Sequence, residues 1–317
     1  MIRARHGLLA AALLAWIAGS TLGTVFSAPD AGAAPFLQIG EAHAGFTPAL
    51  DGTEPIFILF IGSDARTQIG EDIAEQRTDS IHLVGINPAK HKASILGFPR
   101  DSWVEIPGFG TNKINTAMVL GGPELAVATV ENLTGITIDY WALTSFEGLT
   151  TMVDDVGGLV VDVPFEMQDS FSGSDFSPGV QRLSGHEALA FSRDRHSISA
   201  GDFGRSENQG RVFLAALAQF RKEFTKDPSR MLVWLGAGLR NIRTDLSLQE
   251  VLDLAFTAHG IRAKNVDNMV VPGGTGSSGT VSVVYISSEA DAIYRDMAKD
   301  GLVQPRNVPP SPTEQET

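Results

Sequence analysis

Five short segments place arginine and aspartate together, the residue types that phosphate chemistry needs. They are 62–66 (GSDAR), 77–80 (RTDS), 99–101 (PRD), 192–195 (SRDR) and 202–205 (DFGR). Carboxylates hold divalent metal ions that bridge phosphate oxygens. Arginines bind the remaining charge through paired hydrogen bonds and stay protonated at any relevant pH. From the residues alone, Asp64 and Asp79 are candidate metal ligands and the arginines are candidate anion-binding groups.

Each segment taken alone also has a purely structural explanation. Gly-Ser-Asp after a strand is usually a turn, and neighbouring Arg and Asp side chains most often form surface ion pairs that contribute little. Arg193 and Arg195 are two positions apart, so in a helix they would point to different faces. Both reach one site only if the helix ends before them. Five such segments in one chain favour a common site.

The first three segments lie at the ends of apolar runs that have the composition of β-strands. Run 55–62 is apolar throughout and ends in glycine, which is typical of a strand buried on both faces. Runs 80–87 and 93–99 are joined by a short polar turn and predict a hairpin. Ligands bind at strand ends in α/β sheets, so we expect these three segments to converge.

The rest of the domain alternates between helical and extended patterns. Strands are predicted at 136–143, 159–163 and 268–272, and helices at 122–135, 144–156, 183–192, 208–226, 230–242 and 246–259, the last capped by Asp245. This order predicts an α/β fold with a central mixed β-sheet flanked by helices on both faces, an α/β/α sandwich. We expect one domain over 52–302 and no second domain after Pro272. Core packing explains the apolar faces of helices 208–226 and 246–259.

Composition excludes several classes of protein. The chain has 317 residues and a net charge of −13, and such an acidic protein lacks the field that attracts a nucleic acid. An anionic ligand must therefore be bound by a local arginine cluster. The absence of cysteine excludes disulfides, thiolate metal sites and a cysteine nucleophile. The segment around Ser63 lacks the G-x-S-x-G pattern of a serine hydrolase.

The N-terminus has the pattern of an export signal. Arg3, Arg5 and His6 precede the uncharged apolar run 8–26, which is about as long as the ~20 residues that span a bilayer as a helix. The basic flank would stay in the cytoplasm. We expect a signal-anchor over 1–27, an extracytoplasmic linker over 28–51 and a disordered Pro-rich tail over 303–317. The small residues at 31–33 leave a cleaved signal, and a secreted protein, as the alternative; in both cases the domain lies outside the cytoplasm.

Taken in order, the motifs resemble those of the LytR-CpsA-Psr family of cell-wall glycopolymer ligases. The resemblance runs from about residue 56 to 220, through ILFIGSDAR, RTDSIHLVGINP, ILGFPRDSWVEIPG, KINTAMVLGGPE, TVENLTGITIDYW, VDDVGGLVVDVP, LSGHEALAFSRDR and DFGRSENQ. It implies an α/β sandwich with a hydrophobic tunnel for a polyprenyl chain. The implied activity is transfer of a glycopolymer, as a phosphodiester, from a polyprenyl-pyrophosphate carrier to peptidoglycan, typically to the 6-hydroxyl of N-acetylmuramic acid. A single N-terminal membrane anchor is also typical of that family.

The resemblance also implies roles for individual residues. Asp64 and Asp79 would hold Mg²⁺ (or Mn²⁺). The catalytic set would be Asp79, Asp101, Arg77 and Arg100, with Asp101 favoured over Asp79 as general base because it need not bind the metal. The pyrophosphate would be bound by Arg66, Arg77, Arg100, Arg193, Arg195, Arg205 and Gln209.

Two positions depart from the family pattern. Asn208 stands where a second arginine is frequent, and Arg211 would replace that arginine only if the helix turned it inward. Gly210 stands where glutamine is frequent, at a cost of about 0.5–1 kcal/mol for glycine in a helix. Both changes bear on substrate preference, and the sequence does not encode which polymer is transferred.

Two other functions fit the same residues. A pyrophosphatase would use water as nucleophile in the same site. A non-catalytic lipid-glycan binding or regulatory protein is the third reading, and the density of Asp64, Asp79 and Arg100 argues against it.

Overall fold

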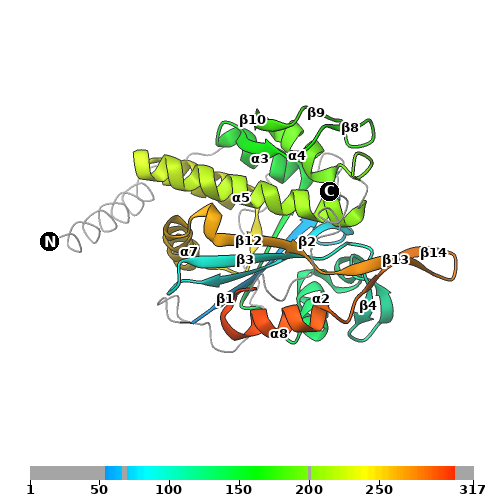
Figure 1. Ribbon diagram of the computed structural model, residues 1–317. Coiled ribbons are helices and arrows are strands. Elements are labelled where there is room, and N and C mark those ends of the chain that lie inside the picture. The colour runs from blue at the N-terminus through cyan, green and yellow to red at the C-terminus, as the bar shows by residue number, and fades with distance from the viewer. Residues whose placement is uncertain (1–53, 66–69, 199–200, 304–317) are drawn as a thin grey trace. The chain divides into compact units, whose positions relative to one another are not determined.

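The computed structural model describes residues 54–65, 70–198 and 201–303, which are built around a six-stranded sheet (Figure 1). Its strand order is β11 (Arg243–Thr244), β6 (Tyr140–Ser145), β1 (Ile56–Ser63), β2 (Thr78–Asn87), β3 (Lys92–Gly97) and β12 (Val266–Val270). Strands β1, β2 and β3 are antiparallel, whereas β6 runs parallel to β1 and β12 parallel to β3. The sheet is therefore mixed, as predicted. The predicted anchor 1–27 and linker 28–51 lie outside the described residues, as does the tail after Val303.

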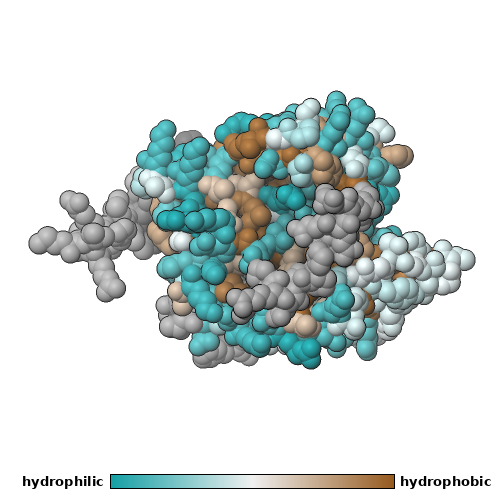
Figure 2. Space-filling model, viewed as in Figure 1, coloured by the Kyte–Doolittle hydropathy of each residue, from teal (hydrophilic) through white to brown (hydrophobic). Residues whose placement is uncertain are grey.

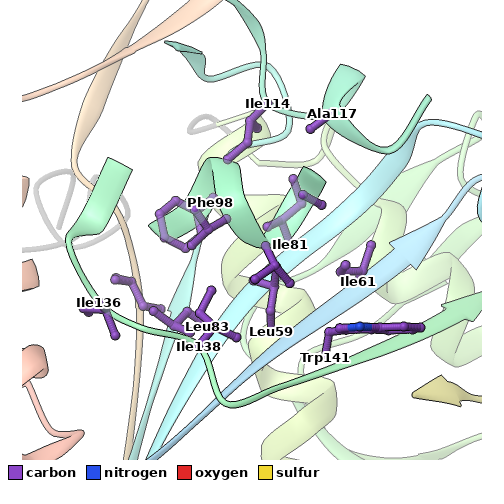
Figure 3. Close-up of a cluster of buried hydrophobic side chains, with 14 of the residues drawn as sticks. Leu59, Ile61, Ile81, Leu83, Phe98, Ile114, Ala117, Ile136, Ile138 and Trp141 are labelled. Carbon is purple, nitrogen blue, oxygen red and sulfur yellow. The ribbon is translucent and has the colours of Figure 1, made fainter. Parts of the chain in front are cut away.

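Strand β1 is buried on both faces, as its unbroken apolar sequence predicts. Leu59 and Ile61 belong to the large core cluster on one face, together with Leu83 and Trp141 (Figure 3). Ile58, one position away from Leu59, belongs to the cluster on the other face. This alternation follows from the two-residue period of a strand.

Helices cover both faces of the sheet, which confirms the α/β/α architecture. Helix α5 (Asp202–Lys226) contacts β2, β3 and β12 on one face, and α7 (Leu248–Gly260) packs beside α5. Helices α2 (Thr116–Thr134) and α8 (Ala290–Asp300) lie on the opposite face (Figure 1).

A third apolar cluster lies beyond α5, away from the sheet. Helices α3 (Phe146–Asp155), α4 (Gly185–Arg193) and α6 (Arg230–Asn241) form it with α5 and β7 (Leu159–Val163). The predicted strand 159–163 therefore exists but pairs with β10 (Gly179–Leu183) instead of the central sheet. The remaining elements are β4 (Trp103–Ile106), β5 (Gly110–Lys113), β8 (Met167–Asp169), β9 (Ser174–Phe176), the short η2 (Ala263–Asn265), β13 (Gly273–Ser278) and β14 (Val281–Ile286).

Several boundaries differ from the sequence prediction. Helix α2 starts at Thr116 and is interrupted at Gly121 and Gly122, so only its second part begins near the predicted position. The cap of α7 is Ser247, because Asp245 is used elsewhere: its carboxylate accepts a hydrogen bond from the backbone N–H of Trp141 (2.9 Å).

Residues 273–300, where sequence patterns predict no helix or strand, form β13, β14 and α8. The β13–β14 hairpin is pale in Figure 2 because Gly, Ser and Thr predominate in it. Within the described ranges, no helix is long and apolar enough to cross a membrane.

Candidate active site

The first three Arg/Asp segments converge at one edge of the sheet, as predicted. Asp64 follows the last residue of β1, and its backbone N–H donates to the carbonyl of Arg77 (3.0 Å), just before β2. The register places Ser63 opposite Thr78, so Asp79 also lies at this edge. Arg100, three residues after β3, forms an ion pair with Asp79.

The ion pair of Arg100 and Asp79 is the centre of what we call the cage, the set Asp64, Asp79, Arg100, Asp202 and Arg205. Asp79 is only 7% exposed. Burial opposes the charge on Arg100, but the carboxylates of Asp79, Asp202 and Asp101 outweigh it and raise the pKa of Arg100. A firmly charged guanidinium held by carboxylates suits an anionic ligand.

Asp64 lies close enough to Asp79 for their charges to interact. Burial, and then the negative charge of Asp79, raise the pKa of Asp64, against the opposing influence of Arg100 and Arg77. A divalent cation beside both carboxylates would favour their charged forms against this burial.

These two carboxylates fit Mg²⁺, which typically takes one or two carboxylates and completes its shell with water and substrate phosphate. No group of three or more His, Cys, Asp or Glu that could hold a metal occurs in the described part of the chain. The protein would thus supply few ligands, and the phosphate the others.

The first turn of α5 supplies the other two residues of the cage, Asp202 and Arg205. Arg205 is 4% exposed and forms an ion pair with Asp202. Burial lowers the pKa of Arg205; the nearby Arg100 and Arg195 act in the same direction, and Asp202 and Asp79 oppose them. The sequence predicted a helix only from residue 208, but the structure starts α5 at Asp202.

Two buried arginine atoms in the cage have no hydrogen-bond partner among the residues that the structure describes. They are the Nε atoms of Arg100 and Arg205. Buried donors are rarely left unpaired in native proteins, so these two atoms are candidate contacts for a ligand; both carboxylate oxygens of Asp202 are likewise without a hydrogen-bond partner among the described residues. Asp202, whose charge acts on both arginines, was not among the predicted site residues, although its DFGR motif contained the signal.

Three other predicted residues lie around the cage. Gln209 is buried and donates through Nε2 to the backbone carbonyl of Asp79 (3.1 Å). Asp101 forms an ion pair with Lys113 (3.0 Å). Arg77 is exposed, and its charge acts on Asp64. The predicted site residue Arg66 lies outside the described residues.

Helix α4 ends at Arg193, and this separates the two arginines of the SRDR segment. Arg193 lies over the ring of Phe146, with 4.7 Å between its guanidinium carbon and the ring centroid. Arg195 follows the helix end, and its charge reaches Arg205. Arg195 thus adjoins the cage, whereas Arg193 faces the neighbouring cavity.

A buried aspartate that the sequence did not single out supports this segment. Asp169 is 3% exposed, and its carboxylate lies 2.9 Å from His196 Nδ1 and 2.8 Å from the backbone nitrogen of Phe171. Burial alone would raise the pKa of Asp169, but hydrogen bonds from His196, Phe171 and the backbone of Arg195 lower it to about 2. Asp169 therefore fixes the backbone that carries Arg195.

An apolar cavity of about 330 Å³ adjoins the cage. Its walls come from β1, β6, α3, α5 and α6 and include Phe60, Leu143, Phe146, Phe213 and Trp234. The cavity is also lined by Ser80, Gln209 and Arg193. Ser80 follows Asp79 in the chain, and Gln209 donates a hydrogen bond to the backbone carbonyl of Asp79. Of the apolar positions on helix 208–226, Val212, Phe213 and Ala216 line this cavity, whereas Val251 and Leu254 of α7 pack beneath β1.

The two departures from the family pattern have structural explanations. Arg211 forms an ion pair with Glu207 (2.6 Å) on the side of α5 that lines a separate cavity with Asn208, so it does not enter the cage. At Gly210, a Cβ atom would lie 1.8 Å from Oδ1 of Asn268 on β12. Glycine therefore leaves room for the amide of Asn268, whose Nδ2 donates to the backbone carbonyl of Glu207 on α5 (3.0 Å).

The structure thus combines an α/β sandwich with an Arg/Asp cage that adjoins an apolar cavity. The chain belongs to the LytR_cpsA_psr family, which matches residues 38–299.

Individual relatives agree with this assignment. The chain is 34% identical over 240 residues to the polyisoprenyl-teichoic acid–peptidoglycan teichoic acid transferase TagU of Bacillus mycoides, covering 75% of this chain and 76% of that protein. The crystal structure of TagV from B. subtilis superposes with a TM-score of 0.65 at 27% identity, over 80% of this chain and 99% of that chain. The structure of TagT bound to LIIa-WTA shares the fold, with a TM-score of 0.65 at 24% identity over 83% of this chain and 96% of that chain.

Proposed function

We propose that this chain is a phosphotransferase that moves a glycopolymer phosphate from a polyprenyl-pyrophosphate carrier to peptidoglycan. The observation that carries the proposal is the junction of the cage with the apolar cavity, where Gln209 belongs to the cavity wall and is hydrogen-bonded to Asp79. A donor with a pyrophosphate head and a prenyl tail matches both parts. The activity in the name of TagU, a transfer from a polyisoprenyl carrier to peptidoglycan, supports the same reaction class.

The arginines bind and orient the pyrophosphate in this proposal. Arg100 and Arg205 have buried Nε donors that are free for its oxygens, and guanidinium groups bind phosphate through parallel hydrogen bonds. Arg77 and Arg195 would bind the pyrophosphate from beside this centre, and Arg193 from the wall of the adjoining cavity. Together they form the local positive site that an anionic donor needs in a chain of net charge −13.

The transfer exchanges one P–O bond for another. A hydroxyl oxygen of peptidoglycan, proposed to be the 6-hydroxyl of N-acetylmuramic acid, attacks the phosphorus attached to the glycan. The bond from that phosphorus to the bridging oxygen breaks, and the oxygen leaves as part of polyprenyl phosphate. Asp101, oriented by its ion pair with Lys113, accepts the hydroxyl proton, and the arginines stabilise the charge that gathers on the phosphate oxygens.

Asp64 and Asp79 would hold Mg²⁺ (or Mn²⁺). When bound, such an ion neutralises negative charge on the phosphate oxygens. Asp64 directly follows β1 and Asp79 is the second residue of β2, so both carboxylates lie at the same edge of the sheet. The domain would act outside the cytoplasm, attached through the predicted anchor at 1–27.

The test is a transfer assay with the full-length protein, a short-chain polyprenyl-pyrophosphate glycan, a peptidoglycan acceptor and Mg²⁺, with products identified by mass spectrometry. We expect a phosphodiester-linked glycan on the acceptor, lost on addition of EDTA. Arg100→Ala should lower the rate by roughly 10²–10³-fold, as for loss of one preorganised donor. Arg240→Ala is the matched control, because Arg240 is an exposed arginine paired with Asp155 at the surface (2.8 Å).

Other outcomes would point to the alternatives. Release of polyprenyl phosphate without glycan on the acceptor would identify a pyrophosphatase. Donor binding without any turnover would identify a binding protein. Full activity in EDTA would remove the metal from the mechanism.

A further inference from the structure

One end of the domain carries positive charge in an otherwise acidic protein. We call residues 221–234 and 248–264 the basic end; they comprise the last turns of α5, the first turns of α6, helix α7 and η2. They contain six Lys and Arg against four Asp and Glu, whereas the whole chain contains 24 against 37. The lysines and arginines at its exposed surface are Lys222, Lys226, Arg262 and Lys264.

Direct contacts hold the elements of the basic end together. Arg221 Nε donates to the carbonyl of His259 (2.7 Å), and the Thr225 hydroxyl lies 3.1 Å from His259 Nε2. The ring of Phe224 packs edge-on against His259 with centroids 4.6 Å apart. The last turns of α5 and the end of α7, at the left of Figure 1, therefore form one continuous surface.

A row of aromatic rings connects the apolar cavity to this surface. Trp234 lines the cavity and contacts Phe220, with ring centroids 5.7 Å apart. Phe220 stacks on Phe224 (5.9 Å), and Phe224 contacts Phe256 (6.1 Å). Phe256 is 50% exposed, so the row runs from the cavity to solvent.

Helix α7 is apolar but has no fully buried residue. Its sequence LQEVLDLAFTAHG contains three leucines, a valine and a phenylalanine, yet none of its side chains is fully buried. Leu248 and Phe256 are exposed, as is Leu232 on the neighbouring α6. Exposed apolar groups beside basic side chains are typical of surfaces that lie in the interface of a membrane.

The chain also enters the domain at this end. Ile56, the first residue of β1, packs in the same apolar cluster as Ile261, with Val251 and Leu254 of α7 against it. The cage lies at the opposite end of β1, after Ser63. The first strand of the described domain therefore begins on the side of the basic end.

We propose that the basic end is a membrane-contacting surface that docks on anionic phospholipid, with Phe256 and Leu232 in the interface and the exposed lysines and arginines among the headgroups. This inference rests on the proposed function only in assuming that a prenyl chain occupies the cavity. Contact between the basic end and the membrane can be measured without that assumption. A cavity of about 330 Å³ is the size of a small-molecule pocket, so a long prenyl chain extends beyond it. The aromatic row leads the rest of that chain towards the bilayer, while the cage stays at the far end of β1.

The test uses the natural absence of cysteine, which makes every introduced cysteine a unique labelling site. Full-length Phe256→Cys is labelled with a polarity-sensitive fluorophore and reconstituted into vesicles of phosphatidylcholine and phosphatidylglycerol that contain spin-labelled quencher lipid. The matched control is Phe171→Cys, another exposed phenylalanine (81%), on the segment that contacts His196 beside Arg195. We expect the fluorescence at position 256 to be quenched, and the fluorescence at position 171 to be unaffected.

Charge dependence provides the second measurement. The quenching at 256 should fall in Lys222→Glu/Lys226→Glu, in pure phosphatidylcholine, and at about 1 M salt, where the Debye length is about 3 Å. Equal quenching at 256 and 171, or quenching that ignores these charge changes, would overturn the proposal. Glycan transfer measured on the same vesicles distinguishes this proposal from the proposed function. Active protein without quenching at position 256 would overturn the docking surface alone. Inactive protein with charge-dependent quenching would support docking and count against the transferase.

Discussion

The Nε2 atom of His82 lies 3.0 Å from the backbone carbonyl oxygen of Ser206, so a side chain of β2 holds the first turns of α5. The carbonyl can only accept, so Nε2 carries the proton, and Nδ1 accepts from the hydroxyl of Ser80 (3.0 Å). His82 is completely buried beside Phe213. The imidazole thus links the sheet to the helix that carries Arg205 and Gln209.

Protonation of His82 should destabilise the fold. Burial lowers the pKa of His82 to about 4, below the unfolded value near 6.5. The unfolded chain therefore binds more protons between these values, and the stabilisation is complete above pH 6.5 and is lost as the pH falls through 4. The whole effect is on the order of 3 kcal/mol.

Urea unfolding of the wild type and of His82→Gln at several pH values from 7 to 4 measures this contribution. Groups other than His82 titrate in both proteins, so their effects cancel in the comparison. We expect the free energy of unfolding to decrease less in His82→Gln over this range. Parallel curves for the two proteins would show that His82 does not contribute.

Asp202 should act through the two arginines beside it. Its carboxylate raises the pKa of Arg100 and forms an ion pair with Arg205. Asp202→Asn should therefore weaken the electrostatic interactions that position these two guanidinium groups. We expect a loss of roughly 10- to 100-fold in kcat/KM, the scale of one hydrogen bond to a charged group. Asp202→Glu should recover part of it. Steady-state transfer kinetics with donor titration are the measurement, and an unchanged kcat/KM in a folded Asp202→Asn protein would contradict the role.

Gly210 should resist substitution although it lies inside a helix. Alanine has the higher helix propensity, but its Cβ would collide with the amide of Asn268. We expect Gly210→Ala to lower the free energy of unfolding by about 1–3 kcal/mol, the usual cost of overpacking. In an Asn268→Ala background the same change should cost little. Denaturant unfolding of the four proteins gives the coupling directly, and simple additivity would refute the steric explanation.

Filling the apolar cavity should weaken binding of the prenyl tail. Ala216 lines the cavity, so Ala216→Phe is expected to raise KM for long-chain donors more than for short-chain ones. Ala218→Phe is the matched control, because Ala218 is exposed on the same helix. Equal effects of the two changes, or no dependence on chain length, would show that the tail binds elsewhere.

Sequence patterns predicted the parts of the fold that depend on local periodicity. Apolar runs identified β1, β2 and β3, and their ends placed Asp64, Asp79 and Arg100 together, because strand polarity and hairpin connection limit where such residues can lie. The condition that the helix end before both arginines of the SRDR segment is not met, because α4 includes Arg193; only Arg195, beyond its end, adjoins the cage.

The elements that sequence patterns do not predict depend on tertiary contacts, which outweigh local propensity. Glycine-rich β13 has weak strand propensity and forms through pairing with β14. Sequence patterns predict the start of α5 six residues too late, because Asp202, Gly204 and Ser206 are poor helix formers. In the structure, Arg205 pairs with Asp202 in this turn, and the carbonyl of Ser206 accepts from His82. Asp169 gave no signal, since its partners come from a segment 27 positions away.

The cage gathers side chains from β1, β2, the loop after β3 and the start of α5, segments that are far apart along the chain. An incompletely folded polypeptide therefore has no such site, and binding of the proposed lipid donor must follow folding. By mass action, a ligand that binds only the native state raises the free energy of unfolding by RT ln(1 + [L]/Kd). The donor should accordingly act as a folding stabiliser after export, protecting freshly folded chains from proteases while leaving unfolded ones exposed.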